Sequence, residues 1–417
     1  MTHIDQNIRW RLLRETSTAF TYNKWTAFRS IPKWKMTVTP DISAEDLEQI
    51  NLLREHVKDK LTPYYDTDFN LLRWLKGHNY NFDQIIPKLR NHLEFRASKW
   101  QLDTVADGKR DHSIHEHWRP GLTGDAIRTP NAIVNIEQSG TNDYWGMLHT
   151  YPINEIMHAR LYDLELMLRT VIERERKTGQ QTSIMYIMDL NGLSYDSRLL
   201  TLLTGALSGI SAFMAEHYVE LIHTFVLVNA PSFISAIWTI VRPVLPERTK
   251  NKVKILGANW RKEILEIAAP EVLPSYWNIP EEKEEVFKAN VLRSIPFDLE
   301  GYYKGGLLDD SSDLLSVPAR KVGFIERDAV QGNTLRWIFE TDGHFAYAIF
   351  FTEKSDEIDV SKMVQVYPRF NKVPGPTYVP LQDHIVCPYS GKYKIWFSNE
   401  HAWLHTLKVH HKVVVER

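Results

Sequence analysis

The sequence has only one cysteine and almost no net charge, and both shortages restrict what the protein can be. Cys387 stands alone among 417 residues, which excludes an intramolecular disulfide and is typical of a reducing compartment. The 50 Lys and Arg residues are balanced by 52 Asp and Glu residues, so the chain as a whole has no electrostatic reason to bind nucleic acid. We therefore expect a cytoplasmic protein without a nucleic-acid partner.

The sequence also lacks the motifs of common catalytic and cofactor sites. It contains no P-loop, no G-x-G-x-x-G and no G-x-S-x-G. Three histidines cluster at His112, His115 and His117, but no further ligand stands at a fixed metal-binding spacing, so surface histidines explain them better than zinc. Asp189 ends a buried strand with no nucleophile beside it, and capping of residues 191–192 explains it better than catalysis. We predict no catalytic residues, no cofactor and no metal site.

No unbroken membrane span is present, although one stretch approaches it. Residues 224–241 carry no charge and come close to the length of a span. Asn229 and Pro231 interrupt the run, and Pro231 would break a helix in its middle. Two elements fit better. Residues 225–228 are fully apolar and predict a strand buried on both faces, while Pro231 suits the first turn of a following helix.

The helix predicted after Pro231 is apolar nearly all the way round. One stripe at helical spacing consists of Phe233, Ile237, Ile240, Val241 and Val244, and a second consists of Ile234, Trp238 and Leu245. Such a helix is either buried on both sides in the core of a large α/β domain or meets lipid. Periodicity alone leaves both interpretations open.

Periodicity divides the chain into regions of different character. Strands are predicted at 133–136, 144–149 and 183–189, and helices at 153–177 and 199–214, an order that favours a mainly parallel sheet. Residues 41–105 have helical periodicity, with Ser43 as a candidate N-cap. In the C-terminal third, Tyr393, Ile395 and Phe397 alternate with other residues between frequent turn signals, which predicts a β-sandwich.

The predicted organisation follows from these regions. It is a basic arm at 1–40, a helical lobe at 41–105, an α/β lobe at 106–280, a linker at 281–304 and an all-β sandwich at 305–417. The arm holds seven Lys and Arg residues against Asp5 and Glu15. A mobile basic arm, a membrane-surface segment and an organelle transit peptide all remain open for it.

Several short motifs, in one order, resemble the CRAL-TRIO lipid-binding family. Asn229, Ala230 and Pro231 match its N-A-P before a hydrophobic gate helix, and RPVL at 242–245 matches the end of that helix. ILGANW at 255–260 is similar to the animal tocopherol-associated, or supernatant protein factor, subgroup. FNLLRWLK at 69–76 and LEFR at 93–96 resemble the family's helical lobe. Residues 391–409 resemble the GOLD (Golgi dynamics) domain.

The resemblance implies a site for one hydrophobic ligand of the phospholipid, phosphoinositide, tocopherol or squalene class. Its candidate lining is Phe225, Leu227, Phe233, Ile237, Ile240 and Val244, and the outer stripe of Ile234, Trp238 and Leu245 would be the membrane gate. Thr249 and Lys252 stand where fungal phosphatidylinositol-transfer relatives contact the headgroup phosphate. A solvated basic face explains these two residues equally well.

The function implied is binding of one lipid and its transfer between membranes, or its presentation to partners. The protein would be cytoplasmic and would associate transiently with membrane surfaces. The alternative is a lipid-sensing scaffold that acts through a protein partner of its GOLD domain in trafficking or signalling.

Overall fold

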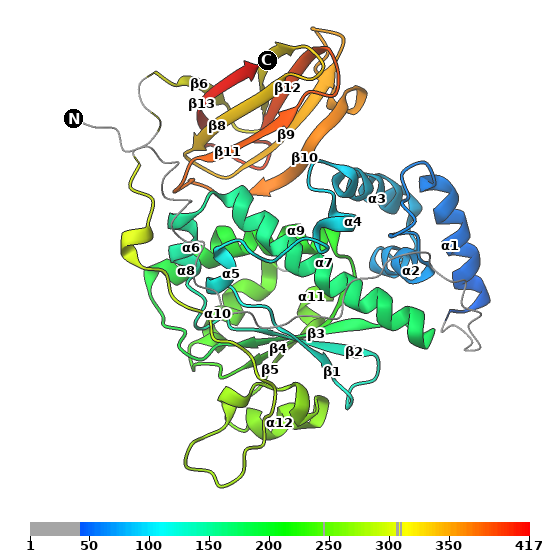
Figure 1. Cartoon of the computed structure of the whole chain (residues 1–417), viewed down its shortest axis with the longest axis vertical. Helices are drawn as coiled ribbons and strands as arrows, with labels where there is room; N and C mark the ends of the chain where they lie inside the picture. The colour runs from blue at the N-terminus through cyan, green and yellow to red at the C-terminus, as the bar shows by residue number, and fades with distance from the viewer. Residues whose placement is uncertain (1–41, 245–246, 306–307, 309–310) are drawn as a thin grey trace. The chain divides into compact units, whose positions relative to one another are not determined.

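The computed structural model describes residues 42–244, 247–305, 308 and 311–417 (Figure 1). The basic N-terminal arm and Leu245 lie outside this part of the chain, as do the side chains of Ile240 and Val244. All contacts reported below belong to one structural unit, Pro40–Arg417.

A five-stranded mixed sheet forms the centre of the α/β lobe. Its strands, in spatial order, are β1 (Leu122–Asp125), β2 (Ala132–Glu137), β3 (Ser183–Asp189), β4 (Ile222–Val228) and β5 (Val253–Ile255). The pairs from β2 to β5 are parallel, and only β1 is antiparallel to its neighbour. The prediction of a mainly parallel sheet is therefore confirmed.

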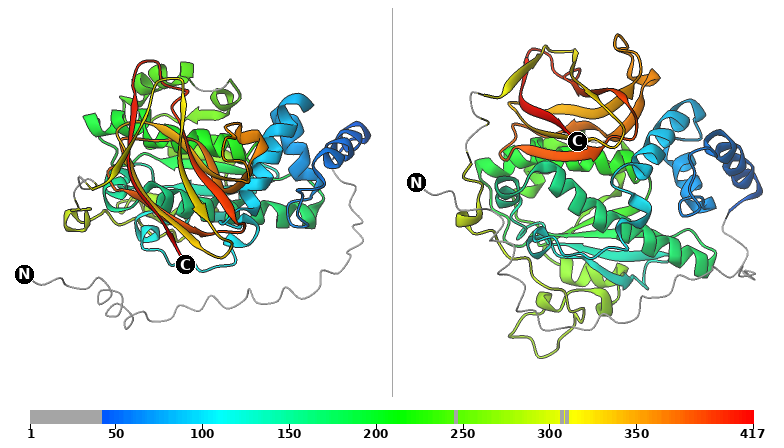
Figure 2. Two further views of the ribbon diagram at one scale, coloured as in Figure 1. Left: turned by 90° about the horizontal axis from the view of Figure 1, so that it is seen from above. Right: turned by 45° about the horizontal axis from the view of Figure 1, so that its top comes forward.

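Helices cover both faces of this sheet (Figures 1 and 2). They are α5 (Ile114–His117), α6 (Tyr144–Thr150), α7 (Ile153–Thr178), α8 (Ser197–Thr204), α9 (Ala206–His217), α10 (Ile234–Val241), α11 (Glu247–Lys252) and α12 (Trp260–Ile267). Ile184 and Tyr186 of β3 pack into the core that contains α7 and α9. Ile264 of α12 packs against Val226 and Val228 of β4 on the other face. Strands covered in this way are apolar on both sides, as 225–228 predicted.

Residues 144–149 were predicted as a strand but form helix α6. Asp143 caps the helix, because its carboxylate accepts a hydrogen bond of 2.8 Å from the Gly146 N–H. Trp145 and His149, four residues apart, lie ring against ring with centroids 4.5 Å apart. The cap and this contact along one helix face favour a helix in a stretch too short for its periodicity to decide.

The single helix predicted at 199–214 is two helices, α8 and α9. Gly205 separates them with φ −105° and ψ −102°, a backbone conformation outside the helical region. A Cβ added at Gly205 would lie 2.9 Å from the Thr201 carbonyl oxygen, so a larger residue would have to shift that turn. The glycine therefore allows the direction of the chain to change between the two helices.

A lobe of four helices precedes the sheet. The helices are α1 (Ala44–Val57), α2 (Asp68–Gly77), α3 (Phe82–Ala97) and α4 (Leu102–Val105). Ser43 accepts a hydrogen bond of 3.0 Å from the Asp46 N–H, which confirms the predicted N-cap. Thr67 and Asn81 cap α2 and α3 in the same way.

Buried ion pairs join this helical lobe to α7. Arg96 of α3 donates two hydrogen bonds to Glu165, at 2.8 and 3.0 Å, and both side chains are 1% exposed. Arg73 of α2 pairs with Glu175 at the other end of α7. Because a buried charge is costly without its partner, these pairs fix the lobe on α7.

The C-terminal region consists of two four-stranded antiparallel sheets. The strands are β6 (Asp313–Val317), β7 (Val322–Ala329), β8 (Thr334–Thr341), β9 (Phe345–Thr352), β10 (Val364–Val373), β11 (Leu381–Val386), β12 (Gly391–Ser398) and β13 (Leu407–Glu416), in the orders β10-β9-β12-β7 and β11-β8-β13-β6. Phe339 of β8 contacts Phe397 of β12 across the two sheets, with ring centroids 5.0 Å apart. Tyr393, Ile395 and Phe397 are all buried, as predicted for a sandwich, but Lys394 and Trp396 between them are buried as well.

The sandwich packs its edge strands against the helices. Phe370 of β10 lies 5.2 Å from Trp100 and 6.0 Å from Phe213 of α9, measured between ring centroids. Asn154 of α7 donates a hydrogen bond of 3.0 Å to the Gln382 carbonyl of β11. The helices thus cover edges that would otherwise be open to pairing.

The predicted linker at 281–304 packs along the α/β lobe. Phe287 is 2% exposed and lies 5.6 Å from Trp277 between ring centroids. The Ala289 N–H donates a hydrogen bond of 2.8 Å to the Leu273 carbonyl. This segment therefore adds to the core beside α12.

Candidate functional site

One face of the sheet carries apolar side chains that are left partly exposed. The registers of three parallel strands align Tyr186 with Phe225 and Val253, and Met188 with Leu227 and Ile255. We call these six residues the floor. Only Tyr186 is fully buried, although β4 has a strand on either side. On the opposite face of β4, Val226 and Val228 are completely buried. The floor is therefore an apolar surface that solvent reaches in the middle of a sheet.

Helices α10 and α8 close over part of the floor. Ile234 and Ile237 of α10 are buried against Leu199 of α8. Leu227 and Ile255 of the floor pack against the same cluster. A small apolar cluster, separate from the two larger cores of the lobe, thus holds α10 on the sheet.

The facing of α10 differs from the predicted one. Ile234 was predicted on the outer stripe with Trp238, but it is 7% exposed and lies on the inner face with Ile237. The helix begins at Ile234, and Ile237 lies one turn further along the same face. These two residues, three apart, therefore form the inner face. Phe233 occupies the N-cap position and is half-buried against Tyr195. Trp238 is half-buried.

The loop that leads into α10 is fixed to the end of β3 by Asp189. Its carboxylate accepts hydrogen bonds from the Asn191 N–H at 3.0 Å, the Asn229 side chain at 2.8 Å and the Trp277 indole at 2.8 Å. Asn229 has φ +53°, a left-handed conformation that asparagine tolerates better than most residues. The predicted capping by Asp189 is confirmed, and Asp189 also joins three separate segments at the entrance to α10.

The two predicted headgroup residues lie at the other end of the floor, and Lys252 already has partners. Its ammonium donates to the Glu220 carboxylate at 2.8 Å and to the Ile222 carbonyl at 2.8 Å. Thr249 is half-buried in α11. Gly77 lies close by, because a Cβ added there would be 3.5 Å from Glu220 Cγ. In this conformation the protein itself compensates the charge of Lys252.

A buried polar network supports the floor at Tyr186. The Tyr186 hydroxyl donates to Glu137 at 2.8 Å and accepts from Arg160 at 2.6 Å. Glu137 also accepts from the Trp118 indole and the Tyr144 hydroxyl, both at 2.7 Å. Burial raises the pKa of Tyr186 well above its ordinary value, so the phenol stays protonated. The network positions the ring and offers no free base beside the floor.

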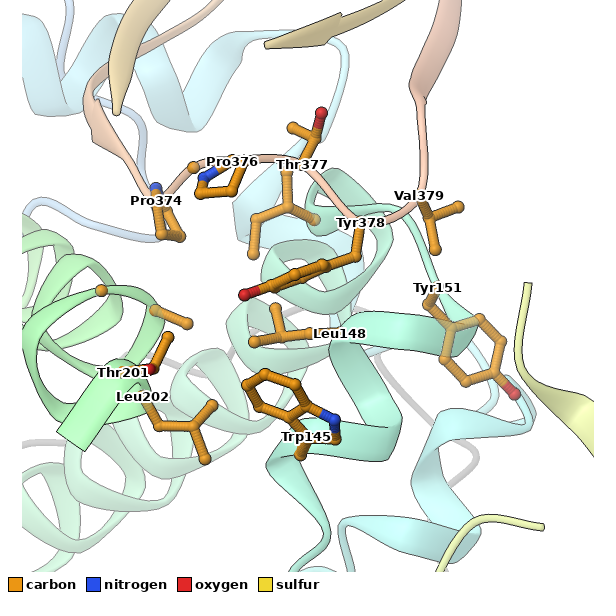
Figure 3. Close-up of a pocket in the computed structure, with 14 residues that line it drawn as sticks. Trp145, Leu148, Tyr151, Thr201, Leu202, Pro374, Pro376, Thr377, Tyr378 and Val379 are labelled. Atoms are coloured by element: carbon orange, nitrogen blue, oxygen red, sulfur yellow. The ribbon is translucent and has the colours of Figure 1, made fainter. Parts of the chain in front are cut away.

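A separate small cavity lies between α6, the α8–α9 junction and the β10–β11 connection (Figure 3). Its volume is about 40 Å³, and Trp145, Leu148 and Tyr378 are among the residues that line it. Ligand pockets usually measure about 300–1,000 Å³. The cavity is therefore a packing gap where the sandwich meets the helices, and the floor remains the candidate site.

Neither a metal-binding cluster nor an uninterrupted membrane span is found in the described part of the chain. Among those residues, no group of three His, Cys, Asp or Glu side chains is arranged to hold a metal ion. His112 pairs instead with Glu155 at 3.2 Å. One segment, Ser197–His217, is long and apolar enough to cross a membrane by length and composition, and 33% of its most apolar window is buried. It comprises α8 and α9 and contains the break at Gly205.

The lobe that carries the floor is similar to a known family. Residues 132–278 match the CRAL/TRIO domain. Residues 42–105 match a domain of unknown function (DUF8435), and residues 308–417 match the "F28H7_8_C:-like, C-terminal domain". The GOLD resemblance of the C-terminal region stays a prediction.

The chain is similar along most of its length to two proteins of Caenorhabditis elegans. It is 26% identical to the CRAL-TRIO domain-containing protein F28H7.8 over 87% of this chain and 90% of that protein. The chain is also 20% identical to protein ctg-1 over 91% of this chain and 100% of that protein. The phosphatidylinositol/phosphatidylcholine transfer protein SFH9 of Arabidopsis thaliana is 21% identical over 57% and 42%. The crystal structure of Sfh5 aligns with 51% of this chain and 81% of its own at 16% identity, with a TM-score of 0.42.

The sequence predicted two of the six floor residues as lining and did not point to the other four. Phe225 and Leu227 were predicted as lining, whereas Met188, Val253 and Ile255 were not. The signal that could have found them is register, because parallel neighbours of β4 residues must share their face. No sequence pattern pointed to Glu220 as the partner of Lys252.

Proposed function

We propose that this protein binds one hydrophobic lipid between the floor and α10, and that it transfers this lipid between membranes or presents it to partners. The observation that carries the proposal is the apolar floor, which is only partly buried although it lies beside and across an interior strand of the sheet. Apolar surface at that place is costly unless an apolar ligand covers it. The CRAL/TRIO match, and a relative named a phosphatidylinositol/phosphatidylcholine transfer protein, support the same conclusion.

The mechanism we propose is movement of α10 away from the floor. The cluster that holds α10 is small, so its separation exposes little apolar surface, and a bilayer would cover what is exposed. Asp189 would keep the loop before α10 in place while the helix moves. Each methylene of an acyl chain buried on the floor contributes about 0.8 kcal/mol, so tight binding needs few polar contacts.

The pairing of Lys252 with Glu220 favours a ligand without a strongly anionic headgroup. To contact Lys252, the phosphate of a phosphoinositide would have to displace the Glu220 carboxylate. Otherwise it would bind beside an ion pair that is already complete. We therefore favour a neutral lipid, a tocopherol or squalene-class molecule, or a zwitterionic phospholipid. We further propose that the protein has no catalytic turnover, that it is cytoplasmic and associates transiently with membranes, and that its C-terminal sandwich is of the GOLD type.

A transfer assay between vesicles tests the proposal. Full-length protein should move fluorescent phosphatidylcholine or a tocopherol analogue from donor to acceptor vesicles, and the anionic phosphatidylinositol more slowly. Leu227→Trp places a larger ring on the floor and should reduce transfer about tenfold, because it occupies the volume of several methylenes. Lys254→Ala is the matched control, since Lys254 is an exposed residue of β5 on the other face. Equal transfer by both variants would contradict the proposal, as would no transfer of any probe by the wild-type protein.

A further inference from the structure

The most exposed large apolar side chains of the sandwich lie next to each other in one loop. Trp403 is 79% exposed and Leu404 is 95% exposed, and both belong to the connection between β12 and β13. Single exposed apolar residues are common, but an adjacent Trp and Leu at this exposure expose a large apolar area to water. Exposed apolar area of this kind is typical of a surface that contacts a partner.

The structure holds this loop in place. Asn399, at its start, is 1% exposed, and its side chain donates to the Val317 carbonyl at 3.0 Å and the His405 carbonyl at 2.8 Å. The Arg320 N–H donates to the Asn399 carbonyl at 2.9 Å. The Arg320 guanidinium lies 4.3 Å from the centroid of the Trp403 ring. The indole is therefore presented at a fixed place.

The charges around the pair suit a bilayer surface. Arg320 and Lys321 form the exposed turn beside the loop, and Lys372 is close enough to act electrostatically on His401. Two acidic side chains lie nearby as well, against these three basic ones. Asp342 accepts from His405 and from the Lys408 N–H, and Glu400 accepts from Ser398. Basic side chains beside an exposed Trp are attracted to lipid headgroups, while the indole favours the interface itself.

The loop also lies beside the helices that cover the floor. His401 contacts the His344 carbonyl oxygen at 3.1 Å. His344 faces the α8–α9 junction, since a Cβ added at Gly205 would lie 3.9 Å from its ring. From there α8 packs on α10 through Leu199. The α8–α9 segment is itself apolar and only partly buried, and Leu200 of α8 is 39% exposed.

We propose that Trp403 and Leu404 form a membrane anchor, which inserts into the surface of a lipid bilayer and brings the α8–α10 end of the α/β lobe to that surface. The role of the anchor in lipid exchange rests on the proposed function. The position and exposure of Trp403 and Leu404 do not depend on the floor. A bilayer explains the apolar pair, its basic neighbours and the adjoining apolar helices together. A protein groove would explain the first of these alone.

Site-specific labelling tests the anchor directly, and the single buried cysteine makes it practical. Full-length Leu404→Cys carries a polarity-sensitive fluorophore, while Cys387 is 1% exposed and serves as the unlabelled background in the wild-type protein. Val330→Cys is the matched control. Val330 is 62% exposed and follows Ala329, which pairs with Gly391 at the opposite end of β12. Vesicles of phosphatidylcholine, with and without phosphatidylserine, are the probe.

We expect the emission of the label at 404 to shift to the blue on vesicles, more strongly with phosphatidylserine, and the label at 330 to stay unchanged. The double variant Trp403→Ala and Leu404→Ala should lower vesicle binding about tenfold or more, because two large apolar side chains are lost. A label at 404 that stays in water on vesicles would overturn the anchor and favour a protein partner. So would equal shifts at 404 and 330, or unchanged binding by the double variant.

Lipid extraction from the same preparations separates this result from the proposed function. Protein that carries lipid but does not insert at 404 contradicts only the anchor. Protein that inserts at 404 but never carries lipid supports the anchor and contradicts only the lipid-binding floor.

Discussion

At the scale of single residues, Asp189 connects more of the lobe than any catalytic motif could have suggested. It is 2% exposed and accepts hydrogen bonds from residues 191, 229 and 277, which lie far apart in the sequence. Its position at the end of a strand was readable from the sequence. Its partners Asn229 and Trp277 were not, because long-range hydrogen bonds leave no local pattern. The structure therefore assigns to Asp189 a positioning role at the entrance to α10.

We expect Asp189→Asn to destabilise the protein by about 1–3 kcal/mol. The amide NH₂ would face an N–H group, such as the Trp277 indole, whose hydrogen bond the carboxylate now accepts. Equilibrium urea unfolding measures the change. Asp196→Asn is the control, because Asp196 caps α8 by accepting from the Leu199 N–H and asparagine caps equally well. Similar losses for the two variants would show that the three-way contact at Asp189 adds little.

At the scale of elements, the α/β lobe followed from the sequence where runs were long or fully apolar. The strands at 183–189 and 225–228 and the helix at 153–177 were predicted for that reason and are present. The prediction of a strand at 144–149 was wrong because a mostly apolar stretch of this length fits a strand or a helix, and the N-cap that Asp143 supplies decides for the helix. The facing of α10 was wrong at Ile234, because facing depends on where the helix begins relative to Leu199 of α8.

The two faces of α10 should respond differently to a charge. Trp238→Asp should lower the free energy of unfolding less than Ile234→Asp does, because Trp238 is only partly buried, and should slow lipid transfer about tenfold, because an indole favours the membrane interface. Thermal unfolding and the vesicle transfer assay measure the two effects.

Ile234→Asp should destabilise the protein by about 3 kcal/mol or more, because it places an unpaired charge in the cluster with Ile237 and Leu199. If Trp238→Asp unfolds the protein as readily as Ile234→Asp, then α10 is an ordinary core helix and does not open.

At the scale of the whole molecule, the helical lobe, the α/β lobe and the sandwich share buried contacts. His92 of α3 and His217 of α9 face each other with their Nδ1 atoms 3.0 Å apart, and each side chain is 1% exposed. Phe213 of α9 in turn contacts Phe370 of the sandwich. Helix α9 therefore lies in contact with both neighbouring domains, and a change in its packing would reach each of them.

The two histidines predict a loss of stability in mild acid. Burial lowers the pKa of His217 to about 3 and that of His92 well below its ordinary value, so both are neutral in the folded protein. Once the pH falls below about 6.5, the unfolded chain takes up protons that the folded protein does not. Stability should therefore fall by about 1.4 kcal/mol per pH unit for each histidine. Urea unfolding between pH 7 and pH 5 measures this slope.

Replacing both residues, His92→Phe with His217→Phe, should remove their share of the slope, whatever it does to the stability at neutral pH. His384→Ala is the control, because His384 is an exposed residue of β11. A pH slope in the double variant as steep as in the wild-type protein would show that the pair is not held neutral.

The central claim is that a lipid lies on the floor, and native mass spectrometry of the purified full-length protein tests it most directly. After incubation with a natural lipid extract, we expect one lipid mass per chain in the wild-type protein. Lys254→Ala should keep that mass, and Leu227→Trp should lose most of it. A wild-type chain that carries no lipid, or full occupancy in Leu227→Trp, would contradict the claim.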